Sequence, residues 1–451
     1  MNASTGLEDQ IEAWRSHALR QRALSPDDVV ELEDHLREQI AELQASGFDH
    51  EEAFLVAIKR LGKLDAVSRE FARQHSDRLW KQLVLLPTEP GYRAGRREAA
   101  VAVALGIGAG LSVWAGSTLV RLQHLDEWTF TLNAGFLVWP WLVGYFAWKR
   151  PPSRGTAASL VGLVAALALA VNLYPFTGGG ATQLLVALHL PLALWFLAGV
   201  AYCGGWSRLT ARLMDFVRFS GEIAIYYLLI ALGGGALVGL TLAILNAVGT
   251  HQGNLVTEWI MPIAAPGALL VAAWLVEAKQ SVIENIAPVL TRVFTPITML
   301  MLLVLLPVLL ASGNVDRAGR EQLILFDAVL IVVAALLLYA VSAREPAAPP
   351  GLFDWLHLGL VVAALAVDAV ALATMAGRVA EFGASPNKLA ALGLNLLLAV
   401  HLAGAGWLSL RFVRGRAPFS AMAHWQVAYL PVYAAWAAAV VLVFPPVFAF
   451  Q

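Results

Sequence analysis

The 451-residue chain contains a single cysteine, Cys203, and this scarcity removes several classes of chemistry. One thiol cannot form an internal disulfide, a Cys-x-x-Cys redox pair or a metal site built on cysteines. The chain also lacks a Gly-x-x-x-x-Gly-Lys-Ser/Thr phosphate loop, a His-Glu-x-x-His zinc motif and a Gly-x-Ser-x-Gly nucleophile elbow. We therefore expect no enzyme activity, no cofactor and no metal.

Charged residues are also scarce, since they make up 14% of the chain while hydrophobic residues make up 59%. A soluble domain carries roughly 25% charged residues. The charges gather at one end, where 28 of them lie in the first 90 positions. This asymmetry predicts a polar head followed by a membrane body. The first ten residues contain no apolar signal core, so we expect the head to stay in the cytoplasm.

Long apolar stretches recur from residue 97, and each can cross a hydrocarbon core of about 30 Å. Backbone amides in lipid must be hydrogen-bonded within the protein, so each stretch should be helical. The predicted fold is all-α: a polytopic membrane bundle of about 11 transmembrane helices with a small N-terminal soluble helical domain. A misread break near 277–293 would make the total ten or twelve. The predicted spans are 97–120, 129–147, 157–176, 183–203, 221–248, 257–276, 293–312, 322–342, 354–376, 388–410 and 426–448.

The pattern divides the chain into a cytoplasmic helical head at 1–86, a juxtamembrane linker at 87–96 and the bundle at 97–451. Lys and Arg are commoner in cytoplasmic loops than in outer ones, and this bias sets an orientation. With the head inside, the inner loops after the first span hold about twelve of them and the outer loops five. The predicted topology therefore has the N-terminus in the cytoplasm and the C-terminus outside.

About four amphipathic helices are predicted in the head, and the second has the clearest signals. Ser25 suits an N-cap, and Pro26 suits the first helical position. Glu33 and Arg37 form an i,i+4 pair on the polar face, so we interpret His35 beside them as part of a solvated surface and not as a metal ligand. The apolar face repeats at helical spacing through Val29, Leu32, Leu36, Ile40 and Leu43.

Four segments follow one another in the head: Glu31 to Glu38, Ala45 to Phe48, Glu51 to Phe54 and Arg60 to Gly62. Over about 60 residues their order resembles the bacterial permease prefix, or HAAS-type, helical domain. That family usually continues with Asp-Pro, where this chain has Lys63-Leu64-Asp65. The resemblance implies a cytoplasmic regulatory or interaction module, and hence a protein partner for residues 1–86.

The membrane body carries a second resemblance. The segments Pro288 to Pro296, Ser385 to Gly393 and Tyr429 to Trp436 are similar to those of the DUF4153 family, a group of bacterial multi-pass membrane proteins whose function is not settled. The resemblance would cover most of 100–450. It implies an architecture in a bacterial inner membrane, but no reaction.

Polar residues at membrane depth are candidate functional residues, because burying one there costs roughly 2.5–3.5 kcal/mol. Asp368 is the clearest, and His401 lies near the middle of the next span. The two spans are joined by a short loop, so we predict that Asp368 and His401 form a proton-titrating pair. The alternative is a structural hydrogen-bonding role. The other candidates are Asn395, Asp327, His189 and Asn246.

The connection over 206–219 is predicted to be an amphipathic helix at the inner membrane surface. Arg208 and Arg212 share one face with Asp215, and with Arg218 these arginines are candidate contacts for lipid headgroups. The alternative is a connector packed under the bundle. The expected partner is therefore the lipid bilayer. Basic residues cluster beside the membrane without interleaved aromatic residues, so no nucleic acid is expected.

Two functions agree with these patterns, and the oligomeric state stays open. The first is a permease-like or transporter-associated protein with a cytoplasmic regulatory head. The second is a membrane sensor or signalling scaffold that recruits a cytoplasmic partner. A hydrated path lined by Asp368, His401 or Asn246 would favour transport. A dry bundle with a mobile head would favour signalling.

Overall fold

The computed structural model describes residues 26–45, 91–247, 253–278, 286–311 and 320–451, together with residues 7, 8, 11, 12, 15, 49, 53, 54, 56 and 57. Within these residues the chain is helical and contains no strand. It divides into two compact units, Met1–Arg93 and Ala94–Gln451.

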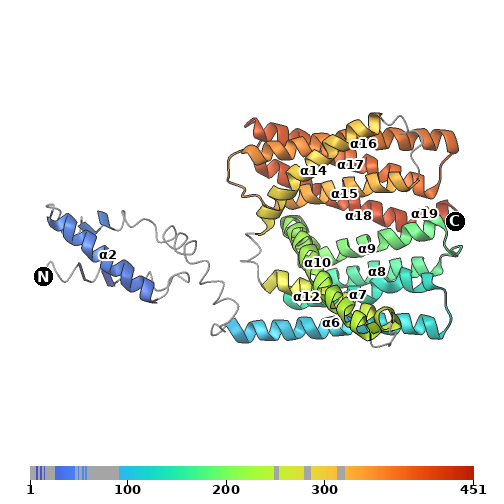
Figure 1. Cartoon of the computed structure of the whole chain (residues 1–451), viewed down its shortest axis with the longest axis horizontal. Helices are drawn as coiled ribbons and strands as arrows, with labels where there is room; N and C mark the ends of the chain where they lie inside the picture. The colour runs from blue at the N-terminus through green and yellow to red at the C-terminus, as the bar shows by residue number, and fades with distance from the viewer. Residues whose placement is uncertain are drawn as a thin grey trace. The chain divides into compact units, whose positions relative to one another are not determined.

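Eleven helices in the described part of the second unit are long and apolar enough to cross a membrane (Figure 1). This result confirms the predicted all-α bundle of a multi-pass membrane protein. The helices are α6 (Gly91–Leu122), α7 (Glu127–Lys149), α8 (Arg154–Leu173), α9 (Ala181–Tyr202), α10 (Leu209–Ala247), α12 (Met261–Ala278), α14 (Ile286–Ala311), α15 (Arg320–Ala343), α16 (Leu352–Phe382), α17 (Pro386–Val413) and α18 (Phe419–Leu442). Four short elements accompany them: η1 (Trp206–Arg208), α11 (Gly253–Leu255), the π-helical η2 (Val256–Ile260) and α19 (Phe444–Val447).

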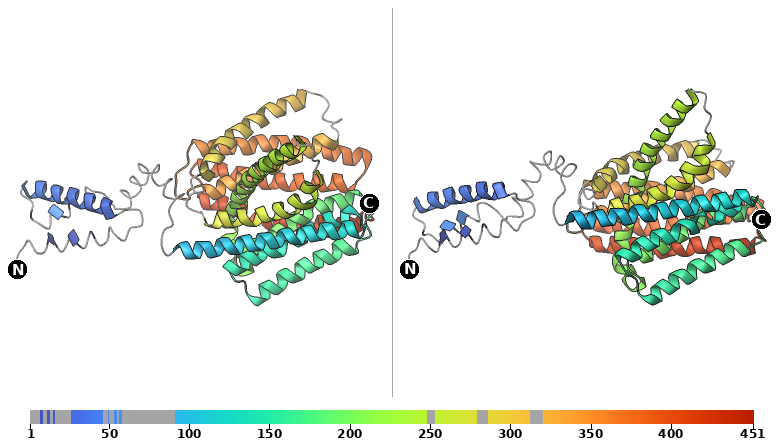
Figure 2. Two further views of the ribbon diagram at one scale, coloured as in Figure 1. Left: turned by 60° about the horizontal axis from the view of Figure 1, so that its bottom comes forward. Right: turned by 90° about the horizontal axis from the view of Figure 1, so that it is seen from below.

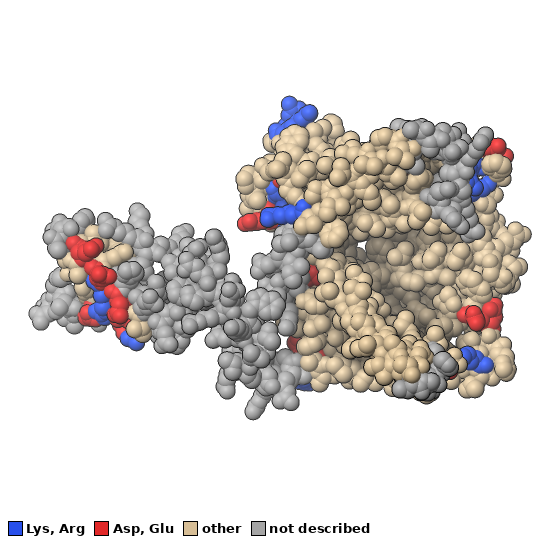
Figure 3. All heavy atoms as spheres, in the orientation of Figure 1, with Lys and Arg blue, Asp and Glu red and all other residues tan. Residues whose placement is uncertain are grey.

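On the face shown in Figure 3, the charged side chains of this unit lie at its two ends and its middle is uncharged. This distribution suits an apolar band that contacts the hydrocarbon core. The start of α6 and the C-terminus lie at opposite ends of the bundle (Figure 1). An odd number of crossings requires that arrangement.

Two apolar cores hold the spanning helices together. The first joins α7, α9, α10 and α12 through large aromatic side chains, including Phe146, Phe216 and Phe219. The second joins α14, α15, α16 and α17 around Leu337 and Leu360. Helix α18 contributes to both cores. The two cores therefore meet at α18.

Close approach of α6 and α12 depends on two glycines of α6. A Cβ at Gly106 would lie 3.2 Å from the carbonyl oxygen of Gly267. A Cβ at Gly110 would lie only 2.6 Å from the carbonyl oxygen of Ile263, which is closer than van der Waals contact allows. Small residues therefore permit close packing of the two helices at these two glycines.

Replacement of Gly110 by leucine is expected to lower the melting temperature by several degrees, because the backbone of α12 leaves no space for a side chain. Overpacking of this kind costs about 1–3 kcal/mol or more. Gly234→Leu on α10 is the matched control, since no described atom lies within 4 Å of the position of its Cβ. Thermal unfolding in detergent, followed by tryptophan fluorescence, measures both. Equal shifts for the two variants would contradict this account of the packing.

Helix α10 runs from Leu209 to Ala247 without a break. The interfacial helix predicted over 206–219 is therefore not a separate element; it consists of η1 and the first turns of α10. The later turns of α10 lean away from the other helices (right view of Figure 2). Leu229, Leu237 and Leu240 there are 59%, 68% and 63% exposed. In a bilayer, lipid chains solvate such a face.

In the first unit, α2 (Pro26–Ala45) begins at the proline predicted to open it. Arg37 donates to Glu33 at 3.0 Å, which confirms the predicted pair, and to Glu8 at 2.8 Å. Its guanidinium lowers the pKa of the Glu8 carboxyl below its usual value. The small core of this unit contains Ile11, Leu36, Ile40, Leu43, Ala53, Phe54 and Ala57.

Several predictions for the head fall outside the described residues. They are the N-cap Ser25, the part of the four predicted helices that follows residue 57, the linker positions 87–90 and the side chains of Leu32 and His35. The linker positions 91–96 are the first turns of α6. The predicted solubility of the head stays a prediction.

Candidate functional site

A polar cluster lies where α15, α16 and α17 meet. The Nδ2 atom of Asn395 on α17 donates to Oδ1 of Asp327 on α15 at 2.9 Å. Asp368 on α16 is close enough to Asp327 for their charges to interact. Asp368 and Asn395 have no exposed surface. Three of the six residues predicted from the sequence are thus brought together inside the bundle.

Asp368 is the least satisfied member of this cluster. Both of its carboxylate oxygens are buried, and neither has a hydrogen-bond partner among the described residues. Oδ1 of Asn395 is in the same state. A buried carboxylate without a partner is costly, because no group replaces the water that it gives up. Such a group is a candidate for binding a proton or a small cation.

His401 belongs to a second network, which α17 and α18 form. Its Nδ1 lies 2.9 Å from the hydroxyl of Tyr433, and its Nε2 lies 2.7 Å from Oε1 of Gln426. The imidazole also stacks on Tyr429, with ring centroids 4.8 Å apart and an interplanar angle of 6°. His401 and Gln426 are completely buried. Both ring nitrogens are therefore occupied by α18.

The predicted pair of Asp368 and His401 is not formed as a hydrogen bond. Neither carboxylate oxygen of Asp368 has a hydrogen-bond partner among the described residues, whereas His401 presents both nitrogens to α18. Gln426 and Tyr433 were missed in the sequence. The signal for them was present, because residues 426, 429 and 433 follow one another at helical spacing on a single face of α18.

A cavity of about 590 Å³ adjoins both networks. Its wall is made mostly of apolar residues from α9, α15, α17 and α18, together with the polar residues Asp327, His189 and Tyr433. Leu188 and Leu192 on α9 and Ile331 on α15 line it and are 59%, 53% and 47% exposed, so the cavity opens sideways at membrane depth. The face of the bundle in Figure 3 is hollowed and surrounded by uncharged side chains.

Cationic residues border one end of this cavity. The cations Arg378 and Lys388 form part of its lining there, together with the neutral Asn387. The Nζ atom of Lys388 donates to the carbonyl of Gly383 at 2.9 Å and lies 5.5 Å from the ring centroid of Phe382. The ammonium group of Lys388 is thus hydrogen-bonded to the backbone at the C-terminal end of α16. Asp327 is the acidic residue in the cavity wall.

The remaining predicted residues have different surroundings. Nδ1 of His189 lies 2.9 Å from the carbonyl oxygen of Leu185 in its own helix, and the side chain lines the cavity. Asn246 is exposed near the end of α10, so its predicted interior position is wrong. Hydropathy places a residue at a depth in the membrane, but it does not show which way the helix face points.

The arginines predicted to contact lipid headgroups lie at the end of α9 that carries Tyr202. Arg212 and Arg218 line a separate pocket there, whereas Arg208 lies against the backbone of Gly204.

Cys203 is buried beside these arginines, and burial raises the pKa of its thiol to about 12. The thiol therefore stays protonated at neutral pH. Among the described residues, no group of three or more His, Cys, Asp or Glu side chains is placed to hold a metal ion.

Comparison with known protein families, curated proteins and solved structures finds no match to this chain. The resemblances to the permease prefix domain and to the DUF4153 family therefore stay predictions. The arguments below rest on the residues of this chain.

Proposed function

We propose that this chain is a permease-like protein of a bacterial inner membrane, with its N-terminus in the cytoplasm and its head as a regulatory module. One observation supports this function above the others: a large apolar cavity that opens to the bilayer is lined by Asp327, the neighbour of Asp368, and the buried carboxylate of Asp368 has no hydrogen-bond partner among the described residues. Transporters commonly bind substrate and coupling ion near the membrane midplane. A substrate would enter sideways, and Asp368 would bind the coupling proton or cation.

The lining of the cavity suggests an amphipathic substrate. An apolar body fits among the leucine and alanine side chains, and a positive group would be favoured beside Asp327. Asn395 already donates a hydrogen bond of 2.9 Å to Asp327, and this bond fixes the orientation of the carboxylate. The fluorescent amphipathic cation ethidium is a suitable probe of this chemistry.

The test uses purified protein in proteoliposomes with an imposed pH gradient. Ethidium flux is expected with the unmodified protein. It should fall several-fold in Ala335→Trp, because Ala335 lines the cavity and the indole would fill part of it. Ala236→Trp on the exposed face of α10 is the matched control and should transport normally. Equal flux in all three preparations, or none above protein-free liposomes, would contradict this proposal.

A membrane sensor remains the second candidate function, and one observation favours it. Asp368 and His401 have no exposed surface, and Asn246 lies on the exposed face near the end of α10, away from both networks. A transporter in an occluded conformation also seals its ionisable groups. Flux is therefore the measurement that separates the two functions.

A further inference from the structure

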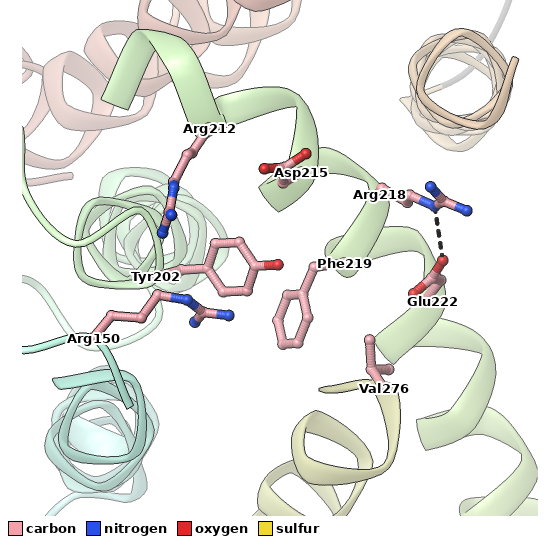
Figure 4. Close-up of a pocket in the computed structure, with 8 residues that line it drawn as sticks. All are labelled: Arg150, Tyr202, Arg212, Asp215, Arg218, Phe219, Glu222 and Val276. Atoms are coloured by element: carbon pink, nitrogen blue, oxygen red, sulfur yellow. Dashed lines mark hydrogen bonds and ion pairs between the residues drawn. The ribbon is translucent and has the colours of Figure 1, made fainter. Parts of the chain in front are cut away.

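A pocket of about 300 Å³ lies beyond the cavity, at the opposite end of α9 (Figure 4). Its cationic residues come from separate elements: Arg150 follows α7, and Arg212 and Arg218 lie on α10. Gly204 and Gly205, with φ values of 82° and 121°, make the turn that leads from α9 towards α10. The left-handed conformation at both positions favours glycine.

Arg150 has an incomplete set of partners. Its Nη2 pairs with Glu277 at 2.8 Å, and the same carboxylate holds Lys149 at 2.8 Å. The guanidinium stacks on Tyr202 at 4.3 Å from the ring centroid. Its Nη1 is buried and has no hydrogen-bond partner in the described part of the chain. Lys149 also pairs with Glu98 at 3.2 Å. Among the described residues, Arg150 has only Glu277 as an acidic partner, shares it with Lys149, and has one donor left over.

Arg212 makes no ion pair with any described residue, and Figure 4 shows its side chain directed towards Arg150 and Tyr202. Arg218 is different, because it pairs with Glu222 at 3.2 Å on the other side of the pocket. Asp215 lies between Arg212 and Arg218, and its carboxylate would repel an anion from the part of the pocket nearest to it. The open position for an anion is therefore between Arg150 and Arg212.

We propose that this pocket binds a phosphate group, held by the guanidinium groups of Arg150 and Arg212. Phosphate suits the arrangement because its oxygens accept several charge-assisted hydrogen bonds, and arginine presents donors in a matching fork. The phosphate belongs either to a phospholipid headgroup or to a free phosphate compound. A bound phosphate would join the ends of α7 and α9 to the start of α10. This site is independent of the cavity and of the proposed transport.

Arg212→Gln is the decisive variant, because Arg212 is exposed and forms no ion pair with a described residue. Loss of one charge-assisted contact should weaken phosphate binding about tenfold or more. Arg150→Lys should have a similar effect, since lysine retains the charge near Glu277 but lacks the second fork donor. Arg414→Gln is the matched control, an exposed arginine in another basic loop.

Binding is measured with the full chain in detergent. Native mass spectrometry reports phosphatidylglycerol and phosphatidylcholine, and calorimetry reports inorganic phosphate. A phosphatidylglycerol site that is weakened by Arg212→Gln but not by Arg414→Gln, without binding of inorganic phosphate, would assign the pocket to a lipid headgroup. Inorganic phosphate binding with the same dependence on Arg212 would assign it to a free phosphate compound. Binding unchanged in Arg212→Gln, or weakened equally in Arg414→Gln, would overturn the proposal.

Discussion

Replacement of Asp368 by leucine is expected to raise the stability of the protein while abolishing gradient-driven flux. The carboxylate has no exposed surface, and both oxygens lack a partner among the described residues. An apolar side chain removes the desolvation cost of such a group, which is about 1–3 kcal/mol. The melting temperature should therefore rise by several degrees. The ethidium assay should show no flux above protein-free liposomes.

Asp368→Asn provides the control for size and shape. Asparagine keeps the volume of the side chain but cannot bind a proton or neutralise a cation as a carboxylate does. We expect it to abolish flux with a smaller gain in stability than leucine. Proteins commonly give up stability at residues that their function requires. A fall in stability in both variants with flux retained would show that Asp368 is a structural hydrogen-bonding group.

Much of the fold could be predicted from the sequence, because its strongest signals are length and hydropathy. The apolar stretches indicated eleven spans, and eleven helices of the described part are long enough to cross. The break near 277–293 was uncertain in the sequence, and the structure places separate helices before and after it. Continuous helices were harder to recognise: α10 begins at Leu209, twelve residues before the span predicted from apolar character, because its first turns are amphipathic.

The candidate site was predicted in composition but not in pairing. Asp368, Asp327 and Asn395 were all identified because polar residues are rare at membrane depth. Their partners depend on the rotation of each helix about its axis, and hydropathy does not report that rotation. Asp368 and His401 lie on neighbouring helices, yet both nitrogens of His401 bond to α18 while the Asp368 carboxylate has no hydrogen-bond partner among the described residues.

Arg150 is one of the Lys and Arg residues counted in the inner loops, and that count does not identify it as part of a site. The feature that distinguishes it from its neighbour Lys149 is its Nη1 atom, which has no hydrogen-bond partner among the described residues, and only the three-dimensional arrangement reveals this. The same holds for Tyr202, whose ring supports the guanidinium. Charge counts along loops predicted an orientation, but they did not predict a pocket.

Replacement of His401 by leucine is expected to change stability in the opposite direction from Asp368→Leu. The substitution would leave the Tyr433 hydroxyl and the Gln426 amide oxygen buried without the partners that now lie at 2.9 and 2.7 Å. Each stranded group costs about 1–3 kcal/mol. Loss of stacking on Tyr429 adds about 0.5–1.5 kcal/mol. A large fall in melting temperature should follow, measured by tryptophan fluorescence in detergent.

A double-mutant cycle tests the cause of that fall. If the cost comes from stranding Gln426, then Gln426→Leu in the His401→Leu background should cost less than it does in the unmodified protein. Strictly additive effects would contradict a coupled network and indicate simple loss of packing. The comparison with Asp368 then separates two uses of buried polarity in one bundle. A group whose removal stabilises the protein is maintained for a ligand, whereas a group whose removal destabilises it holds helices α17 and α18 together.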